Sequence, residues 1–162
     1  MNLYGIGLIL IVATAQASSN ALDHNIGDFG DSIPTIRANL NGKCDELSQR
    51  ELSILLNVVK NSQTQLECDG FVYRGQKRFV EMMFSDGHLD IIHIMGTESD
   101  HEELTNILTA EFGEPSFSSD QTIYYRSEGI SLRTIPHEIS FVSERVRDQY
   151  DDYMRSLSQK IE

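Results

Sequence analysis

The stretch RFVEMMFSDGHLDIIHIMG, residues 78–96, is the strongest indication of how this chain folds. Asp86-Gly87 at its centre is a preferred pair for a two-residue hairpin turn, in which both residues take positive φ. Apolar, aromatic and β-branched residues dominate the segments on both sides of the turn, as they do in strands. The stretch therefore predicts a β-hairpin of two strands, residues 78–85 and 89–95.

The same stretch contains histidines and aspartates that could suggest an acid–base or metal site. Successive side chains of a strand point to opposite faces, so His88 and Asp90 share one face and His93 lies on the other. The two histidines then cannot chelate one ion, and Asp90 cannot pair with His93. Asp86 belongs to the turn, and we expect His88 and Asp90 to be exposed to water. We assign neither a catalytic residue nor a metal site here.

The segments before the hairpin predict two helices and a third strand. Ser32 precedes a short helical pattern that ends at residues 41–42, and Ser48 with Glu51 forms a capping box before a second, residues 48–59. In that second pattern, leucines and a valine recur at i, i+3, i+4 and i+7. Residues 64–74 then alternate as a strand, with Leu66, Cys68, Gly70 and Val72 on one face, although Gly70 indicates weakening or a bulge. A turn is expected at residues 75–76.

The segments after the hairpin predict a helix, two strands and a final helix. Residues 97–113 form the clearest helix: Ser99 and Glu102 make a capping box, Gly113 ends it and Pro115 prevents its continuation. Strands are expected at residues 121–127 and 129–134, the latter resuming at 138–142. Residues 144–161 close the chain as a helix.

These elements predict an α+β fold in the order α-α-β-β-β-α-β-β-α. Strands joined by tight turns pair antiparallel, which gives a single meander sheet of about five strands. The amphipathic helices are expected to cover one face of this sheet. The length after removal of a leader suits one domain, residues 32–162.

The N-terminus, MNLYGIGLILIVATAQASS, is typical of a secretory signal peptide. Ala15-Gln16-Ala17 fits a signal-peptidase site, which predicts a signal peptide at residues 1–17 and a flexible leader at 18–31. The n-region contains no Lys or Arg, and a retained anchor is the alternative, although the apolar run is shorter than the roughly 20 residues of a membrane span. We therefore expect an exported protein, periplasmic or secreted, with no membrane attachment after cleavage.

The cysteine content also favours export. The chain has two cysteines, Cys44 and Cys68, and a single pair in an exported protein predicts one disulfide. Closing a loop of about 25 residues would stabilise the fold by about 3.5 kcal/mol on the chain-entropy model.

The net charge and the missing motifs exclude several function classes. With 25 acidic and 13 basic residues the net charge is −12, which disfavours binding to nucleic acid or to anionic membranes. The acidity is typical of an exported protein that stays soluble, and attraction to a basic protein partner is the alternative. Metal-ligand spacings, nucleophile elbows and glycine-rich phosphate loops do not occur, so we predict no cofactor. His101 lies in the first turn of the helix at 97–113, where acidic neighbours complement the helix dipole.

A mixture of tyrosines and basic residues is the best candidate for an interaction surface, because Tyr and Arg are favoured at protein interfaces. The alternative is that these residues form cross-strand pairs on an open sheet face. The candidate interface comprises Tyr73, Arg74, Lys77, Arg78, Tyr124, Tyr125 and Arg126.

The run FSDGHLDIIHIMG, a capped helix, EFGEP and a strand that ends in ISFVS resemble the layout of many small exported bacterial proteins. The order of elements resembles BamE-like and β-lactamase-inhibitor-protein-like architectures over residues 32–143. The lipoprotein cysteine typical of BamE-like proteins is absent. The resemblance is one of topology, and no functional residue is transferred from it.

We therefore predict an exported, non-catalytic protein-binding module of the bacterial envelope or secretome, of the inhibitor or accessory-factor type. The alternative is a small extracytoplasmic hydrolase or metal-dependent enzyme that uses His88, Asp90 or His101. A third hypothesis is a structural envelope component recognised through its C-terminal helix, residues 144–162.

Overall fold

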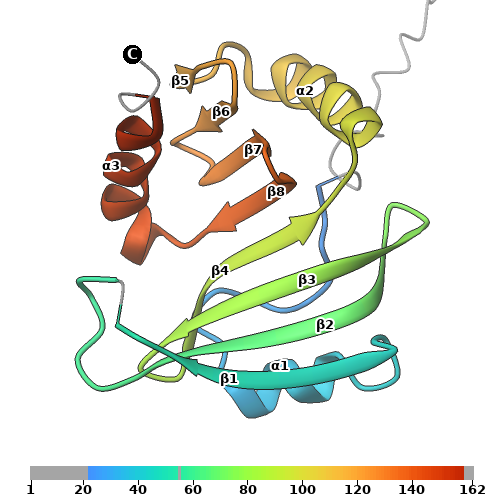
Figure 1. The fold of residues 1–162 in the computed structure, drawn as a ribbon, viewed down its shortest axis with the longest axis vertical. Coiled ribbons are helices and arrows are strands. Elements are labelled where there is room, and N and C mark those ends of the chain that lie inside the picture. Colours follow the sequence, from blue (N-terminus) through green and yellow to red (C-terminus); the bar gives the residue numbers. More distant parts are fainter. Residues whose placement is uncertain (1–21, 55, 159–162) are drawn as a thin grey trace, which may run out of the picture.

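The computed structural model describes residues 22–54 and 56–158, which contain one antiparallel sheet of eight strands in the order β1-β2-β3-β4-β8-β7-β6-β5 (Figure 1). The elements follow one another as α1 (Ile33–Asn39), β1 (Glu46–Leu52), β2 (Gln63–Tyr73), β3 (Gln76–Ser85), β4 (His88–Met95), α2 (Glu98–Phe112), β5 (Phe117–Ser118), β6 (Thr122–Tyr125), β7 (Ile130–Thr134), β8 (His137–Val142), the 3-10 helix η2 (Glu144–Val146) and α3 (Arg147–Ser158).

The sheet consists of two four-stranded meanders, β1–β4 and β5–β8, joined where β4 pairs with β8. A helix precedes each meander, α1 before β1 and α2 before β5. The last strand of each meander is therefore central in the sheet, and the first strand of each lies at an edge. This arrangement brings residues of β4 and β8 together in the middle of the molecule.

The prediction of about five strands in the order α-α-β-β-β-α-β-β-α is wrong. Residues 46–52 form the edge strand β1 instead of entering a helix at Ser48, because they pair with β2 along their whole length. Ser48 and Glu51, the expected capping pair, instead bond to Glu67 and Thr64 of β2. Long-range pairing has overridden a local helical pattern. The short strand β5 was not expected, and β8 is a separate strand that follows β7.

The hairpin around residues 86–87 is confirmed. Asp86 and Gly87 have φ of 51° and 83°, as the predicted turn requires, and β3 pairs antiparallel with β4. The preceding turn lies one residue earlier than predicted, because Arg74 and Gly75 take the positive φ values of 51° and 76°.

The expected irregularity at Gly70 is also present. The pairing of β2 with β3 shifts register between Cys68 and Phe71, on either side of Gly70. A Cβ atom on Gly70 would lie 2.2 Å from the Asp45 carboxylate, so a larger residue does not fit there. The shift turns Phe71 and Tyr73 into the core and leaves Val72 exposed, opposite to the face predicted for Val72.

The central helix is confirmed as α2, but its cap is different. Thr97, not Ser99, is the N-cap, and the reciprocal partner in the capping box is Asp100 instead of Glu102. The helix ends at Gly113, whose φ is 77°.

Helices cover both faces of the sheet, not one as predicted. The larger apolar cluster joins one face to α1 and α2 through residues such as Ile36 and Leu108. The second cluster joins the opposite face of the β5–β8 half to α3 through Tyr150 and Met154. Among the described elements no helix lies over β1–β3 on that second face, and Figure 1 shows these strands facing the viewer with α1 behind.

The described part of the expected leader, residues 22–31, lies against the sheet. Ile26 is fully buried, Gly30 N–H donates to Leu89 O at 2.9 Å, and Leu89 N–H donates to Asp31 O at 2.9 Å. The predicted signal peptide, residues 1–17, lies outside the described residues. Among the residues that are described, no helix is long and apolar enough to span a membrane.

The predicted disulfide is confirmed. Cys44 and Cys68 are bonded with an S–S distance of 2.00 Å. Cys44 precedes β1 and Cys68 lies within β2, so the bond attaches the edge strand to its neighbour.

Candidate functional site

The second face of the sheet carries a row of polar side chains from β1 to β6, along which each residue is paired with the next across neighbouring strands. The row consists of Ser48, Glu67, Glu81, His93, Ser140, Ser131 and Tyr124. Its β1–β3 part is open, whereas α3 covers its β6–β8 part through the ring contact between Tyr124 and Tyr150. His93 lies at the boundary between the two parts, so each part forms a distinct candidate site.

Like charges face each other in the open part. Glu46 pairs with Asp69 across β1 and β2, and Glu67 pairs with Glu81 across β2 and β3. Directly opposed like charges destabilise a sheet unless a cation or a hydrogen-bond donor offsets them. Arg50 partly does so at the second pair, because its Nε and Nη2 atoms lie 2.6 Å from Glu67 and 3.8 Å from Glu81.

The Gln65 side chain adds to the compensation at the same pair. Its amide donates hydrogen bonds to Glu67 at 3.0 Å and to Glu81 at 2.7 Å. Among the described salt bridges none reaches Glu46 or Asp69, so no described ion pair offsets their repulsion.

The open part contains a shallow hollow of about 280 Å³, which we call the acidic hollow, lined by Glu46, Ser48, Glu67, Asp69 and Phe79. The Phe79 ring is 36 % exposed. An exposed aromatic ring beside carboxylates is an arrangement that receives a cationic group, by Coulomb attraction and by contact with the ring face.

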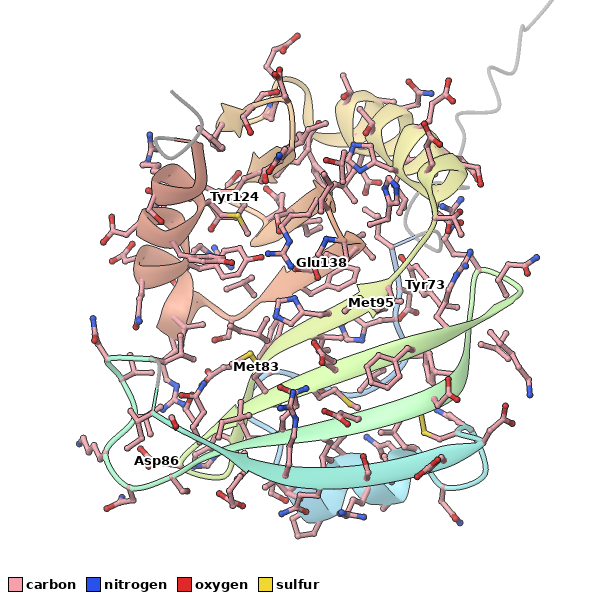
Figure 2. All side chains as sticks on the ribbon, viewed as in Figure 1. Tyr73, Met83, Asp86, Met95, Tyr124 and Glu138 are labelled. Carbon is pink, nitrogen blue, oxygen red and sulfur yellow. A yellow bond between two sulfur atoms is a disulfide. The ribbon has the colours of Figure 1, made fainter. Side chains whose placement is uncertain are left out.

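The covered part forms a pocket of about 410 Å³ between the sheet, the segment after β1 and α3, which we call the α3 pocket. Its apolar walls are Leu56, Met83 and Ile91, its polar floor is His93, Arg133 and Glu138, and its α3 side is Gln149, Tyr150 and Tyr153. Figure 2 labels Glu138 and Met83, which come from the two strands on either side of β4.

The floor of the α3 pocket is a hydrogen-bonded network of buried polar groups. The Glu138 side chain is 3 % exposed, lies 2.9 Å from Arg133 Nε and accepts the Ser140 hydroxyl proton at 3.2 Å. His93 Nδ1 lies 2.8 Å from Ser140 Oγ and 3.6 Å from Glu138. Burial lowers the pKa of His93, against the opposing effect of Glu138 and Glu81, so the ring is neutral at pH 7.

These bonds determine the tautomer of His93. Because the Ser140 hydroxyl donates its hydrogen bond to Glu138, its oxygen accepts a hydrogen bond from His93 Nδ1–H. Nε2 of the neutral ring then carries no proton and is a hydrogen-bond acceptor.

The group Ser140–His93–Glu138 has the composition of a hydrolase triad but not its geometry. In a triad, the serine and the carboxylate lie on opposite nitrogens of the ring, whereas here both lie near Nδ1. Ser140 is also fully buried. The hydroxyl cannot attack a substrate from this position.

The expectation that His88 and Asp90 form a water-exposed pair is wrong. A register shift in the β3–β4 pairing buries Asp90, which is 1 % exposed. The Asp90 carboxylate accepts from Ser143 Oγ at 2.8 Å and from Arg145 Nε at 3.0 Å, while His88 is exposed and contacts Gly30 O. Asp90 and His88 therefore have different hydrogen-bond partners, and those of Asp90 hold the chain after β8.

The predicted Tyr/Arg interface is not one surface. Its tyrosines, Tyr73, Tyr124 and Tyr125, are buried in the core, which contradicts their expected exposure. Each of its basic residues forms an ion pair with an acidic side chain. The four pairs are Arg74–Glu103, Lys77–Asp45, Arg78–Asp100 and Arg126–Asp148. The two groups lie on opposite halves of the sheet, because β4, β8 and β7 separate β3 from β6.

His101, the remaining candidate, is brought close to His137, with 6.3 Å between ring centroids. The Nδ1 atom of each ring is buried and has no hydrogen-bond partner among the described residues. Burial, and then the proximity of His137, lowers the pKa of His101. Within residues 22–54 and 56–158 no group of three or more His, Cys, Asp or Glu side chains is placed to hold a metal ion.

Sequence reasoning missed the floor of the α3 pocket. Glu138 and Ser140 alternate with Ile139 and Phe141, and the same alternation is expected of a strand with one face in water. The only available signal was His93 within the apolar run IIHIM, where a polar group on a central strand requires buried partners.

Comparisons with known proteins identify no relative. No protein-family model matches the chain, and neither curated proteins nor solved structures contain a match.

Proposed function

We propose that this chain is an exported protein-binding module that contacts a basic partner protein through the acidic hollow on β1–β3. The observation that carries the proposal is the pair of opposed carboxylates, Glu46 and Asp69, on a sheet face that none of the described helices covers. A Lys or Arg side chain placed in the hollow would neutralise this repulsion and contact the Phe79 ring.

The chemistry of the whole chain supports the same kind of partner. The net charge of −12 attracts cationic surfaces and accelerates their association. The Cys44–Cys68 disulfide supports residence in an oxidising compartment, and thus export. Location in a periplasm or outside the cell is part of the proposal.

The proposal predicts that a tetralysine peptide binds the acidic hollow. Binding should shift the amide NMR signals of β1, β2 and the Phe79 region and should weaken steeply with added salt. The double variant Glu46→Gln/Asp69→Asn should bind about tenfold more weakly, because two charges contribute at most about 1 kcal/mol each at an exposed site. The same variant should be more stable than wild type by up to about 0.5 kcal/mol, because the opposed charges are gone.

A matched control removes the same charge elsewhere. Glu102→Gln/Glu111→Gln changes two exposed carboxylates of α2 and should leave both the affinity and the map of shifted signals unchanged. Equal weakening by the two double variants, or shifts spread over all acidic surfaces, would mean that the peptide senses only net charge, and the proposal would be rejected.

A further inference from the structure

The α3 pocket is a second site, separate from the acidic hollow and with a different charge. The hollow is lined by carboxylates, whereas the two ionised groups of the pocket, Arg133 and Glu138, lie 2.9 Å apart and compensate each other. His93 adds no charge when neutral. A pocket without net charge in a chain of net charge −12 favours neither an anion nor a cation.

Burying the polar floor of the α3 pocket costs free energy of folding that a purely structural role would not require. Burying an ion pair and a histidine opposes folding unless every group finds partners, and apolar residues of similar size would serve a core as well or better. Here the pair Arg133–Glu138 and the ring of His93 instead line a space of about 410 Å³. This volume lies in the range of small-molecule sites, which combine apolar walls with a few convergent polar groups.

The hydrogen-bond network defines which polar group of a ligand fits. His93 Nδ1 is hydrogen-bonded to Ser140 Oγ. The Tyr150 hydroxyl is hydrogen-bonded to Ser131 Oγ, with 2.9 Å between the oxygens. Because Nδ1–H donates to Ser140, Nε2 of the neutral His93 ring is a hydrogen-bond acceptor. The complementary ligand group is therefore a donor.

The apolar walls define the rest of the ligand. Leu56, Met83 and Ile91 line the pocket together with the rings of Tyr150 and Tyr153, whose centroids lie 6.1 Å apart. A lining of aliphatic and aromatic side chains favours a flat or cyclic apolar body. We infer that the α3 pocket binds a small uncharged molecule that is mostly apolar and carries one hydrogen-bond donor, such as a phenol, an alcohol or an aryl amine.

The test uses N-phenyl-1-naphthylamine, an uncharged fluorescent aryl amine with one N–H group. Its fluorescence should rise saturably with one probe bound per chain, and amide NMR shifts in the wild-type protein should concentrate in β3, β4 and α3. The N-methyl derivative lacks the donor and should bind about tenfold more weakly, the equivalent of one lost hydrogen bond.

Two tryptophan variants place the binding. Met83→Trp fills the pocket and should weaken binding by about tenfold or more, since overpacking a site excludes its ligand. Val72→Trp adds the same side chain to the open face and should leave binding unchanged. Lack of saturable binding, or shifts outside the pocket, would overturn the inference even if Met83→Trp did not fold.

Two further results are decisive. Equal affinity of a folded Met83→Trp protein would exclude this pocket as the site. Equal affinity for the N-methyl derivative would exclude a donor as the recognised group. Neither result bears on the acidic hollow, because the tetralysine experiment uses different residues.

Discussion

The neutral state of His93 shows how the surroundings of a single residue override its ordinary chemistry. Glu138 and Glu81 both favour the imidazolium, and the side chain lies 3.6 Å from Glu138. Burial opposes them and is the larger effect, because the ring is only 15 % exposed and loses most of its hydration. The pKa of His93 in the folded chain is consequently below its ordinary value of 6.5.

This pKa predicts a loss of stability under mild acid. The unfolded chain takes up a proton on His93 as the pH falls through 6.5, before the folded chain does. The contribution of His93 to the free energy of unfolding is thus complete above pH 6.5 and decreases below it. Urea unfolding at pH 7.5 and pH 5.0 should show a smaller decrease in His93→Gln than in wild type.

The stability of His93→Gln should keep some pH dependence, because burial also lowers the pKa of His24 and His101. Identical decreases in the variant and in wild type would show that His93 is protonated at the same pH in both states of the chain.

At the scale of elements, the attachment of α3 to the sheet creates the α3 pocket. The link between β8 and α3 is held by Asp90, whose carboxylate binds Ser143 and Arg145 and whose carbonyl accepts from Ser143 N–H at 2.8 Å. Arg145 also donates to Ser85 O at 3.1 Å, so η2 is tied to both β3 and β4. α3 then continues across the second face with Tyr150 and Met154 buried.

Removal of the Asp90 carboxylate should therefore destabilise the protein. Asp90→Ala leaves the buried Ser143 side chain and the partly exposed Arg145 guanidinium without their acceptor, which should lower the free energy of unfolding by about 2–3 kcal/mol. The control Asp148→Ala removes a carboxylate that is 91 % exposed and pairs with Arg126, and it should cost less than about 1 kcal/mol. Chemical denaturation of both variants measures the difference, and equal losses would contradict the role given to Asp90.

At the scale of the whole molecule, the disulfide acts on the unfolded chain. Cys44 and Cys68 are separated by 24 positions, and their bond closes a loop that contains β1, the connection to β2 and the first part of β2. Within the part of the chain that the structure describes, the edge strand β1 is paired on one side, and covalent attachment compensates for this limited pairing. The loss of loop entropy in the unfolded state raises the free energy of unfolding.

The double variant Cys44→Ala/Cys68→Ala should lose about 3.5 kcal/mol of stability on the chain-entropy model. Urea unfolding of wild type with a thiol reductant should reproduce most of that loss, and the variant should not respond to the reductant. Equal midpoints for oxidised wild type and the variant would show that the bond does not stabilise the fold.

Several elements could be predicted because their signals are local. Asp86 and Gly87 adopt positive φ in a turn of two residues, and α2 ends at Gly113, which also has a positive φ. Such preferences depend on the clash of a side chain with its own backbone, which does not change with the rest of the fold. The disulfide was predictable for a different reason, since Cys44 and Cys68 are the only cysteines in the chain.

The errors concern residues whose environment is set by distant segments. Ser48 and Glu51 have the spacing of a capping box, but both lie in a strand that pairs with β2. Asp90 follows a hairpin turn and looks exposed, but a register shift turns it toward Ser143, which lies 53 positions away. A sequence window that contains only one of the partners cannot reveal such contacts.

Local sequence was therefore sufficient for the turns, the central helix and the cysteine pair, because steric preference and composition act over a few residues. The eight-stranded sheet, the uncovered carboxylates of the acidic hollow and the α3 pocket arose from pairing between segments far apart in the chain. His93, Ser140 and Arg133 come from β4, β8 and β7, and they meet only because β4 pairs with β8 and β8 pairs with β7. The physical reason is that these groups become buried and hydrogen-bonded to one another only when the sheet forms, so their interaction free energy depends on the whole fold.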